Sequence, residues 1–245
     1  MRIARAFDRA EAYDQHAEVQ RRVAAALAAR VAALPLPPCP RVLEIGCGTG
    51  LLGRELIDRL PNADWTMTDI APAMVERARA HFKGRGNVEF AVMDGEHPDR
   101  PGPFDLIVSN LALQWFMDLA GGVARLRRLL APGGWLAFTT LADGTFAEWQ
   151  EAHGDLPAAT PHFATAAALE ALGLEISVRD EHVRHGSARA FVRGLKALGA
   201  ATPRAGHRPL RPAELRAVLE RFEAVGAPAR YVVATCLARS TAECA

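Results

Sequence analysis

The sequence predicts an α/β protein whose mostly parallel sheet carries helices on both faces. Short apolar runs that suit buried strands alternate along the chain with longer, helix-like runs. A glycine-rich turn follows the first apolar run, and hydrophobic residues make up 50% of the 245 residues, enough for a sizeable core. Because strands that alternate with helices are joined by right-handed crossovers, we expect one sheet covered on both sides.

The N-terminal part of the chain is predicted to be helical. Residues 10–33 contain many alanines and few helix breakers, so they favour one or two helices. The prolines between Leu34 and Pro40 form a stiff connector that a helix cannot cross. We therefore divide the chain into an N-terminal helical segment, residues 1–38, and a main domain, residues 39–245.

The middle of the chain alternates between strands and helices. The expected strands are Arg41–Ile45, Asp64–Thr68, Val88–Val92, Phe104–Ser109 and Trp135–Thr140. The expected helices are Leu51–Leu60, Pro72–Phe82 and Leu119–Leu130. Pro72 suits the first turn of its helix, where the missing N–H costs nothing, and Pro132-Gly133-Gly134 marks a sharp turn after a helix.

The last third of the chain is less regular. Its helical candidates are His162–Leu172, Ala188–Ala197 and Pro212–Val225, and its strand candidates are Glu175–His182 and Tyr231–Ala238. Together with the five earlier strands, these two bring the expected sheet to seven strands.

Composition and residue spacing argue against several classes of function. The 29 Lys and Arg residues balance the 28 Asp and Glu residues, so no overall positive charge points to nucleic acid. No apolar run approaches the ~20 residues that span a bilayer, and charges interrupt the N-terminus before a signal peptide's apolar core forms. Scattered cysteines without a C-x-x-C pair predict free thiols in a reducing cytoplasm, and histidines without ligand spacing predict no metal site.

The glycine-rich turn is the most informative feature of the chain. It lies in the run R-V-L-E-I-G-C-G-T-G, residues 41–50. Gly46, Gly48 and Gly50 alternate between a buried strand and a helix, where glycine lets the backbone approach a ligand closely. A dinucleotide-binding turn is one alternative, but its fingerprint would need a third glycine where Leu51 stands. A turn that only packs a helix on a strand is another, but such a turn seldom needs three glycines. The turn resembles motif I of the class I S-adenosylmethionine (SAM) methyltransferases.

Acidic residues lie at the end of the first strand and just after the second and third, where open α/β sheets bind their ligands. Asp69 can accept hydrogen bonds from two ribose hydroxyls, a role shared by nicotinamide enzymes, or it can cap the helix at Pro72. Asp94 precedes Gly95 and could also contact a ligand, but an Asp-Gly pair is common in ordinary turns that bind nothing. The resemblance implies that Glu44 holds the α-amino group of SAM directly or through water, Asp69 the ribose, and Asp94 the adenine amino group.

Neighbours of these acids complete the predicted cofactor site. Ile70 could lie against the adenine face, and Met74 could line the adenine pocket or belong to the core. The full predicted set is Glu44, Gly46, Cys47, Gly48, Gly50, Asp69, Ile70, Met74, Asp94, Gly95, Asn110 and Leu111.

Four further stretches narrow the resemblance. They are Ala6–Gln20, Ser109–Trp115 with the pattern S-N-L-x-x-Q-W, Phe138–Leu141 and Leu195–Ala200. In combination they resemble the malonyl-acyl-carrier-protein O-methyltransferases of biotin synthesis, with looser similarity in residues 154–160 and 200–212. The resemblance implies a Rossmann-like class I methyltransferase fold, in which the seven-stranded sheet has an antiparallel edge and residues 1–38 form a helical lid.

Members of that family transfer a methyl group from SAM to the free carboxylate of a malonyl thioester on acyl carrier protein, which leaves S-adenosyl-L-homocysteine. The resemblance implies the same reaction here, giving the malonyl methyl ester primer for biotin synthesis. A carboxylate is already ionised at pH 7, so we expect no general base, no triad and no metal. Catalysis would depend on alignment of the reacting atoms and on exclusion of water.

Four residues are candidates for the catalytic step. Tyr13 and His16 lie three apart, hence on one face of a lid helix, and could close over SAM together with Trp115. Ordinary packing is the alternative for each of the three. Gln114 could orient the ester or carboxylate.

The late helices, residues 145–225, are expected to contact the substrate and its carrier. Arg193 and Lys196 lie three apart near the end of one predicted helix. They could meet the malonyl carboxylate, the phosphopantetheine group or the acidic carrier protein, or they could form a solvated basic surface.

Three other functions stay open on the sequence alone. The first is SAM-dependent methyl transfer to another small carboxylate or to a natural-product hydroxyl. The second is SAM binding without catalysis, and the third is a nicotinamide-dependent oxidoreductase.

Overall fold

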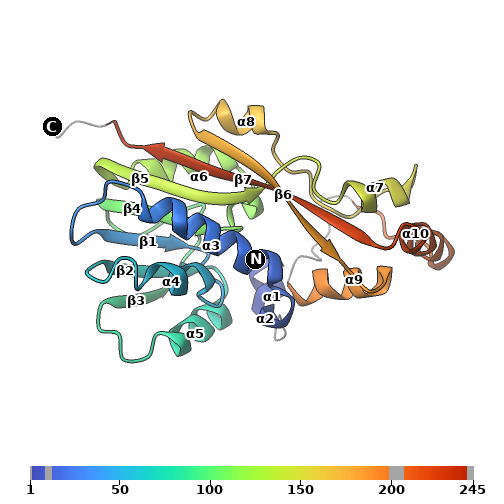
Figure 1. Cartoon of the computed structure of the whole chain (residues 1–245), viewed down its shortest axis with the longest axis horizontal. Coiled ribbons are helices and arrows are strands. Elements are labelled where there is room, and N and C mark those ends of the chain that lie inside the picture. The colour runs from blue at the N-terminus through green and yellow to red at the C-terminus, as the bar shows by residue number, and fades with distance from the viewer. Residues whose placement is uncertain (1, 9–12, 199–206, 242–245) are drawn as a thin grey trace.

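The protein is built on one seven-stranded sheet, and the computed structural model describes residues 2–8, 13–198 and 207–241. The strands are β1 (Arg41–Ile45), β2 (Asp64–Asp69), β3 (Val88–Val92), β4 (Phe104–Asn110), β5 (Leu130–Leu141), β6 (Glu175–Arg184) and β7 (Pro228–Arg239). They lie in the order β3-β2-β1-β4-β5-β7-β6 (Figure 1). Strands β1 to β5 are parallel to their neighbours, and β7 is antiparallel to both β5 and β6. The predicted mostly parallel sheet with an antiparallel edge is confirmed.

Helices connect the strands and extend the N-terminus. They are α1 (Arg2–Asp8), α2 (Tyr13–His16), α3 (Glu18–Ala32), α4 (Leu51–Leu56), α5 (Pro72–His81), the 3₁₀ turn η1 (Leu113–Trp115), α6 (Leu119–Arg127), α7 (Ala147–His153), α8 (Ala166–Glu170), α9 (Ala188–Ala197) and α10 (Pro212–Ala224). The sequence predicted most of these, but it did not predict α1, α7 or η1.

Three helices are shorter than predicted by several residues. Helix α4 ends at Leu56 instead of Leu60, and local contacts explain the bounds of the other two. Helix α6 ends before Leu130, because that residue already pairs with Phe104 at the start of β5. Helix α8 covers only part of the predicted helix 162–172. The Thr165 side chain accepts a hydrogen bond from the N–H of Ala168 and thereby fixes where α8 begins.

The predicted turn at Pro132-Gly133-Gly134 lies inside β5 instead of before it. Leu130 pairs with Phe104 and Trp135 pairs with Leu106, so the register shifts between the two pairs. The extra residues of β5 bulge out of the ladder there, and Gly133 takes a φ of +73°.

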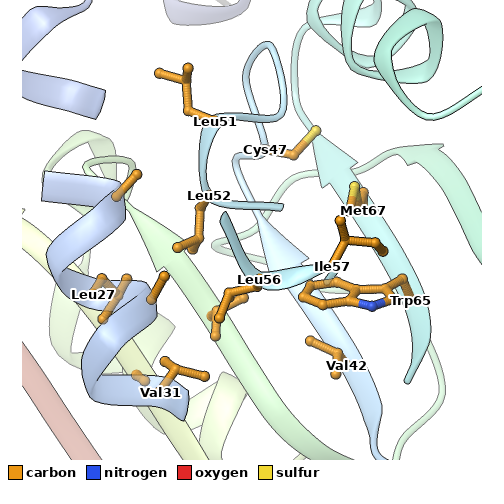
Figure 2. Packing of buried hydrophobic residues seen from close by; sticks show 14 of the residues in the cluster. Leu27, Val31, Val42, Cys47, Leu51, Leu52, Leu56, Ile57, Trp65 and Met67 are labelled. Carbon is orange, nitrogen blue, oxygen red and sulfur yellow. The ribbon is translucent and has the colours of Figure 1, made fainter. Parts of the chain in front are cut away.

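Helices cover both faces of the sheet, because alternate residues of each strand point to opposite sides. On β1, Val42 belongs to the layer under α3 and α4, whereas Leu43 belongs to the layer under α6 and α8. Figure 2 shows the first layer, in which Leu56 of α4 lies between Leu27 of α3 and Trp65 of β2. All three side chains are fully buried. Burial of each such side chain stabilises the fold by about 1.5–3 kcal/mol, so these layers hold the strand ends firmly in place.

A separate aromatic cluster holds the late helices against the far ends of β6 and β7 (Figure 1). Trp149 of α7 and Phe191 of α9 both contact Phe222 of α10, with ring centroids 5.1 Å apart in each case. Phe146 packs edge-on against Tyr231 of β7 at 4.7 Å. The predicted late helical region therefore has its own packing centre next to the main core.

The N-terminal helices divide between the core and the edge of the molecule. Helix α3 buries Leu27 and Val31 in the main core, whereas α1 and α2 lie beside α5 and α9 (Figure 1). The boundary predicted at residue 38 stays a prediction. Within the described ranges, no helix has both the length and the apolar composition needed to cross a membrane.

Candidate functional site

A cavity of about 200 Å³ lies at the carboxyl ends of β1 to β4, and we call it the sheet-edge cavity. Its lining joins the strand ends to the N-terminal helices and to the segment after β4. The lining residues are Phe7, Tyr13, Ile45, Gly46, Gly48, Asp69, Ile70, Met93, Asp94, Gly95, Glu96, Asn110, Leu111, Ala112, Trp115, Phe116 and Met117. The fold therefore gathers most of the predicted cofactor residues around one hollow.

Two glycines of the turn after β1 shape the floor of this cavity. Both have positive φ, +65° at Gly46 and +54° at Gly48, which L side chains rarely adopt. A Cβ at Gly46 would overlap with the Cβ of Ala112, so no larger residue fits there. A Cβ at Gly48 would meet no atom within 4 Å, because this glycine faces open space in the cavity.

Asp69, at the end of β2, is held rigidly in the cavity wall. Its Oδ2 accepts a hydrogen bond from the N–H of Gly48 and its Oδ1 from the N–H of Ala71, both at 2.9 Å. The side chain does not cap α5, whose N-cap residue is Ala71. Burial raises the pKa of the Asp69 carboxyl, and the hydrogen bonds from Ala71 and Gly48 oppose that rise. A carboxylate fixed in this way can accept further hydrogen bonds from vicinal hydroxyls of a ligand.

Asp94 and Gly95 follow β3 in a tight turn. Asp94 Oδ1 accepts a hydrogen bond from the N–H of Glu96 at 3.0 Å, and Oδ2 lies 3.2 Å from the ring of His97. A Cβ at Gly95 would overlap with the side chain of Ile45. Glycine at position 95 therefore brings this turn close to β1, and Asp94 lies at the cavity's exposed side.

The N-terminal helices close the cavity opposite the strand ends. Phe7 of α1 packs edge-on against Trp115, with ring centroids 5.8 Å apart. Tyr13 of α2 is partly buried, and burial together with nearby Asp69 and Asp14 raises the pKa of its phenol. The hydroxyl therefore stays neutral at pH 7 and can donate a hydrogen bond.

Among the hydrogen bonds that attach this N-terminal segment to the main domain, three lie close to the cavity. Thr49 Oγ1 donates to Asp14 Oδ1 at 2.7 Å, next to the glycine turn. The Nδ2 of Asn110 donates to the carbonyl of Gln20 at 3.1 Å. The N–H of Ala73, in the first turn of α5, donates to Asp8 Oδ1 at 3.1 Å. These bonds fix α1, α2 and the first turn of α3 beside the cavity.

A second, smaller cavity of about 60 Å³ adjoins the first, and we call it the inner cavity. Four residues line both: Phe7, Tyr13, Leu111 and Trp115. None of the described residues that line the inner cavity is charged. Gln114 donates from Nε2 to the carbonyl of Leu111 at 2.7 Å, and its Oε1, like that of Gln20, is buried without a partner among the described residues.

Leu111, on the wall between the two cavities, has an unusual backbone. Its φ is +52°, although it is not glycine. The N–H donates to Thr139 Oγ1 at 3.0 Å, and the carbonyl accepts from Gln114, so both sides of the peptide are held. Left-handed residues of this kind are concentrated at functional sites, because only a fixed surrounding maintains them.

Four residues of the predicted cofactor set do not line the sheet-edge cavity. Glu44 is buried beneath α4, where burial and the nearby Asp69 carboxylate raise its pKa to about 8. Burial likewise raises the pKa of the Cys47 thiol, which belongs to the main core. Gly50 begins α4, and Met74 is fully buried beside Phe7 and Tyr13.

The substrate-side candidates lie in different places. Tyr13, Gln114 and Trp115 line the inner cavity, but His16 is exposed and faces a cavity next to α9. Arg193 and Lys196 are exposed on α9 and line neither the sheet-edge nor the inner cavity.

Two functional features escaped prediction from the sequence. Phe7 lies in a helix that no periodicity indicated. Glu96 is buried, and its carboxylate accepts hydrogen bonds from the N–H groups of Met117 and Asp118 at 2.8 and 2.9 Å. It fastens the segment after η1 to the end of β3. Only a tertiary contact shows this, because Glu96 and its partners are far apart in sequence.

The described part of the chain contains no group of three or more His, Cys, Asp or Glu side chains arranged to hold a metal ion. Cys39, Cys47 and Cys236 are free thiols. Burial raises the pKa of Cys236 to about 12. None of these three thiols lines the sheet-edge cavity, the inner cavity or the cavity next to α9.

Comparisons with known proteins place this site in a family. A family model described as a methyltransferase domain matches residues 43–136, which run from β1 into β5. A malonyl-[acyl-carrier protein] O-methyltransferase of Magnetococcus marinus is 43% identical over 227 residues, covering 89% of this chain and 84% of that protein. The chain belongs to the malonyl-[acyl-carrier protein] O-methyltransferase family. The methyltransferase identity predicted from the turn after β1 and from the S-N-L-x-x-Q-W segment is therefore confirmed.

A larger relative agrees with this assignment, and a solved structure shares the fold. The biotin biosynthesis bifunctional protein BioCD of Bordetella avium is 53% identical over 235 residues. The match covers 94% of this methyltransferase but only 50% of the relative, so the chain spans about half of that protein's length. The YcgJ protein of Bacillus subtilis has a TM-score of 0.63 at 16% identity, covering 90% of this chain and 99% of that one, which shows a shared fold.

Proposed function

We propose that this protein transfers a methyl group from SAM to the free carboxylate of a malonyl thioester on acyl carrier protein, which would give a malonyl methyl ester primer for biotin synthesis. The observation that carries the proposal is the pair of adjoining cavities. A chemically suited cofactor site shares one wall with a small uncharged cavity. The name of the Magnetococcus marinus relative supplies the substrate class, and that of the Bordetella avium relative supplies the link to biotin synthesis.

The residues of the sheet-edge cavity fit SAM. Gly48 leaves open the space that a Cβ would fill, and Asp69 presents a fixed carboxylate to a ribose diol. Asp94 and the backbone at Gly95 suit the adenine end, with Ile70 beside them. When bound there, SAM supplies a methyl group on a positively charged sulfur, and its product would be S-adenosyl-L-homocysteine.

The inner cavity suits an acceptor that needs no general base. A malonyl carboxylate is ionised at pH 7, so its oxygen is ready to form the new bond to the methyl carbon. Phe7 and Trp115 exclude water from the wall that the two cavities share, which leaves such a carboxylate poorly solvated. Neutral Tyr13 and the amide of Gln114 are the polar groups available to position it.

Helix α9 is the proposed docking surface for the acidic carrier protein. Arg189, Arg193 and Lys196 recur at helical spacing on its exposed side, whereas Phe191 and Gly194 face inward. None of the three cations has an ion-pair partner among the described residues. Positive charge exposed in this way attracts an acidic protein and speeds its association.

The docking role predicts a difference between large and small substrates. We expect Arg193→Glu to lower kcat/KM on malonyl-acyl carrier protein by about tenfold, while activity on malonyl-pantetheine changes less than twofold. Arg128→Glu, an exposed substitution at the end of α6, is the matched control and should affect neither substrate. An equal loss on both substrates in Arg193→Glu would remove the docking role.

The methyl transfer itself is tested by mass spectrometry. Malonyl-acyl carrier protein is incubated with the enzyme and SAM, and one added methyl group on the malonyl moiety is expected. Methylation of free small acids or hydroxyl compounds, with none on the malonyl thioester, would contradict the proposal and favour a different substrate. A cytoplasmic setting, where acyl carrier protein and reduced thiols occur together, remains part of the same proposal.

A further inference from the structure

A third cavity of about 230 Å³ lies between α2 and α9, and we call it the α9 cavity. Its described lining combines polar and basic side chains with small residues. These residues are Gln15, His16, Glu18, Val19, Val183, Arg184, His185, Gly186, Gly194, Leu198 and Tyr231. The described lining of the sheet-edge cavity contains no such basic groups, so this cavity suits a different chemical group.

The three cavities form a series. The α9 cavity and the inner cavity share Leu198 and Tyr231, and the inner cavity shares its other wall with the sheet-edge cavity. Tyr231 is buried on β7, its ring packs against Phe146, and it forms part of the wall of both cavities. A long, thin group that begins in the α9 cavity would therefore reach the cofactor site by way of the inner cavity.

The charges of the α9 cavity favour an anion. His16, Arg184 and His185 contribute donors, and Arg184 has no ion-pair partner among the described residues. The Nε2 of His185 is buried and has no hydrogen-bond partner in the described structure. Glu18 is the one acid in the described lining, and its carboxylate is already paired with Arg22 at 3.1 Å.

A competing opening exists beside α7. That cavity, lined by residues 150–162, shares Thr160 and Pro161 with the inner cavity. Its described lining contains His153 and His162 but no arginine or lysine. It is therefore less suited to an anionic group than the α9 cavity, which also adjoins the basic face of α9.

We infer that the α9 cavity binds the phosphate of the phosphopantetheine arm, and that the arm passes Leu198 and Tyr231 to place its thioester in the inner cavity. This inference rests on the proposed function. His16, Arg184 and His185 would hold the phosphate. The same phosphate occurs on acyl carrier protein and in coenzyme A, so the site would serve either carrier, and α9 would add preference for the protein.

Gly194 provides a direct test of the route. A Cβ on this helical glycine would meet only His16 Nδ1 at 3.8 Å and His185 Cε1 at 3.9 Å, which are ordinary contacts. Gly194→Leu should therefore fold, since leucine favours a helix more than glycine does, while its side chain fills the α9 cavity. We expect KM for malonyl-phosphopantetheine to rise at least tenfold, with unchanged affinity for SAM. Ala158→Leu, in the cavity beside α7, is the control and should change neither this KM nor the affinity for SAM. A higher KM in Ala158→Leu with an unchanged KM in Gly194→Leu would overturn the inference.

Removing the phosphate tests what the cavity recognises. In wild-type enzyme, malonyl-phosphopantetheine should have a lower KM than malonyl-pantetheine, which lacks only the phosphate. Arg184→Ala combined with His185→Asn should raise the first KM about tenfold and leave the second within twofold, with kcat unchanged for both. Equal effects on both substrates, or no effect, would overturn the phosphate site. Wild-type enzyme that methylates neither thioester would instead contradict the proposed function.

Discussion

The substitution Gly48→Ala should have two effects that can be measured separately: a loss of stability from backbone strain and a loss of affinity for the cofactor. Gly48 has a φ of +54° and faces open space in the sheet-edge cavity. Alanine in the left-handed region costs about 1–2 kcal/mol, which lowers the melting temperature of a domain of this size by roughly 2–8 °C. Because no protein atom lies within 4 Å of the new Cβ, strain should be the whole effect on stability.

The ligand gives the second effect. The added methyl would occupy space that we assign to SAM, so we expect the affinity for SAM and S-adenosyl-L-homocysteine to fall at least tenfold, or about 1.4 kcal/mol. Gly84→Ala is the matched control, because Gly84 also has a positive φ, +84°, and open surroundings, but it lies away from the cavity. Urea unfolding and calorimetric titration measure the two quantities separately. Equal SAM affinity in the two variants would refute the placement of the cofactor against this turn.

Other predictions concern Glu44, Asp69, the Phe7–Trp115 pair and the identity of the cofactor. The pKa of Glu44 is higher in the folded protein than its value of 4.5 in the unfolded chain, so the folded protein retains a proton that the unfolded chain loses. The free energy of unfolding should therefore fall as the pH rises from about 4.5 to 8. Urea unfolding across this range should show no such fall in Glu44→Gln. Asp69→Asn should weaken SAM binding at least tenfold in calorimetry and destabilise the fold by roughly 1–3 kcal/mol, because its amide cannot accept from both Gly48 and Ala71; an unchanged affinity would remove Asp69 from the site. A double-mutant cycle of Phe7→Ala and Trp115→Ala, measured by unfolding, should give a coupling of about 0.5–1.5 kcal/mol, and additive effects would mean that α1 is not held against Trp115 in solution. NAD should bind more weakly than SAM in parallel titrations, and the opposite order would overturn the cofactor assignment.

The sequence predicted the parts of the site that local pattern determines. Three alternate glycines after an apolar run placed the floor of the cavity, and position after a strand selected Asp69 and Asp94. These inferences succeed because strand ends in a parallel sheet converge at one edge, whatever the rest of the chain does. The same pattern could not show that Glu44 is buried beneath α4, although the next residue of β1, Ile45, faces the cavity.

The parts that could not be predicted depend on contacts between distant segments. Phe7 reaches Trp115 only because α1 is attached across the cavity, and the helical spacing of Tyr13 and His16 gave no sign that they face different cavities. Both lie in α2, a single turn that tertiary contacts position. The left-handed Leu111 likewise has no sequence signal, because its conformation is imposed by bonds to Thr139 and Gln114.

The distribution of charge gives the proposed reaction a physical rationale. A malonyl carboxylate loses its negative charge as the methyl group is transferred, so a cation beside it would stabilise the ground state more than the transition state. The inner cavity, whose described lining is uncharged, avoids that penalty. The cations lie outside it: Arg184 lines the α9 cavity, and Arg193 is exposed on α9. Charges in that position can attract a phosphate or an acidic protein, because neither group changes its charge during the reaction. Gln114→Arg should accordingly lower KM for the malonyl thioester and lower kcat by a larger factor. A higher kcat in this variant would show that the acceptor oxygen lies elsewhere.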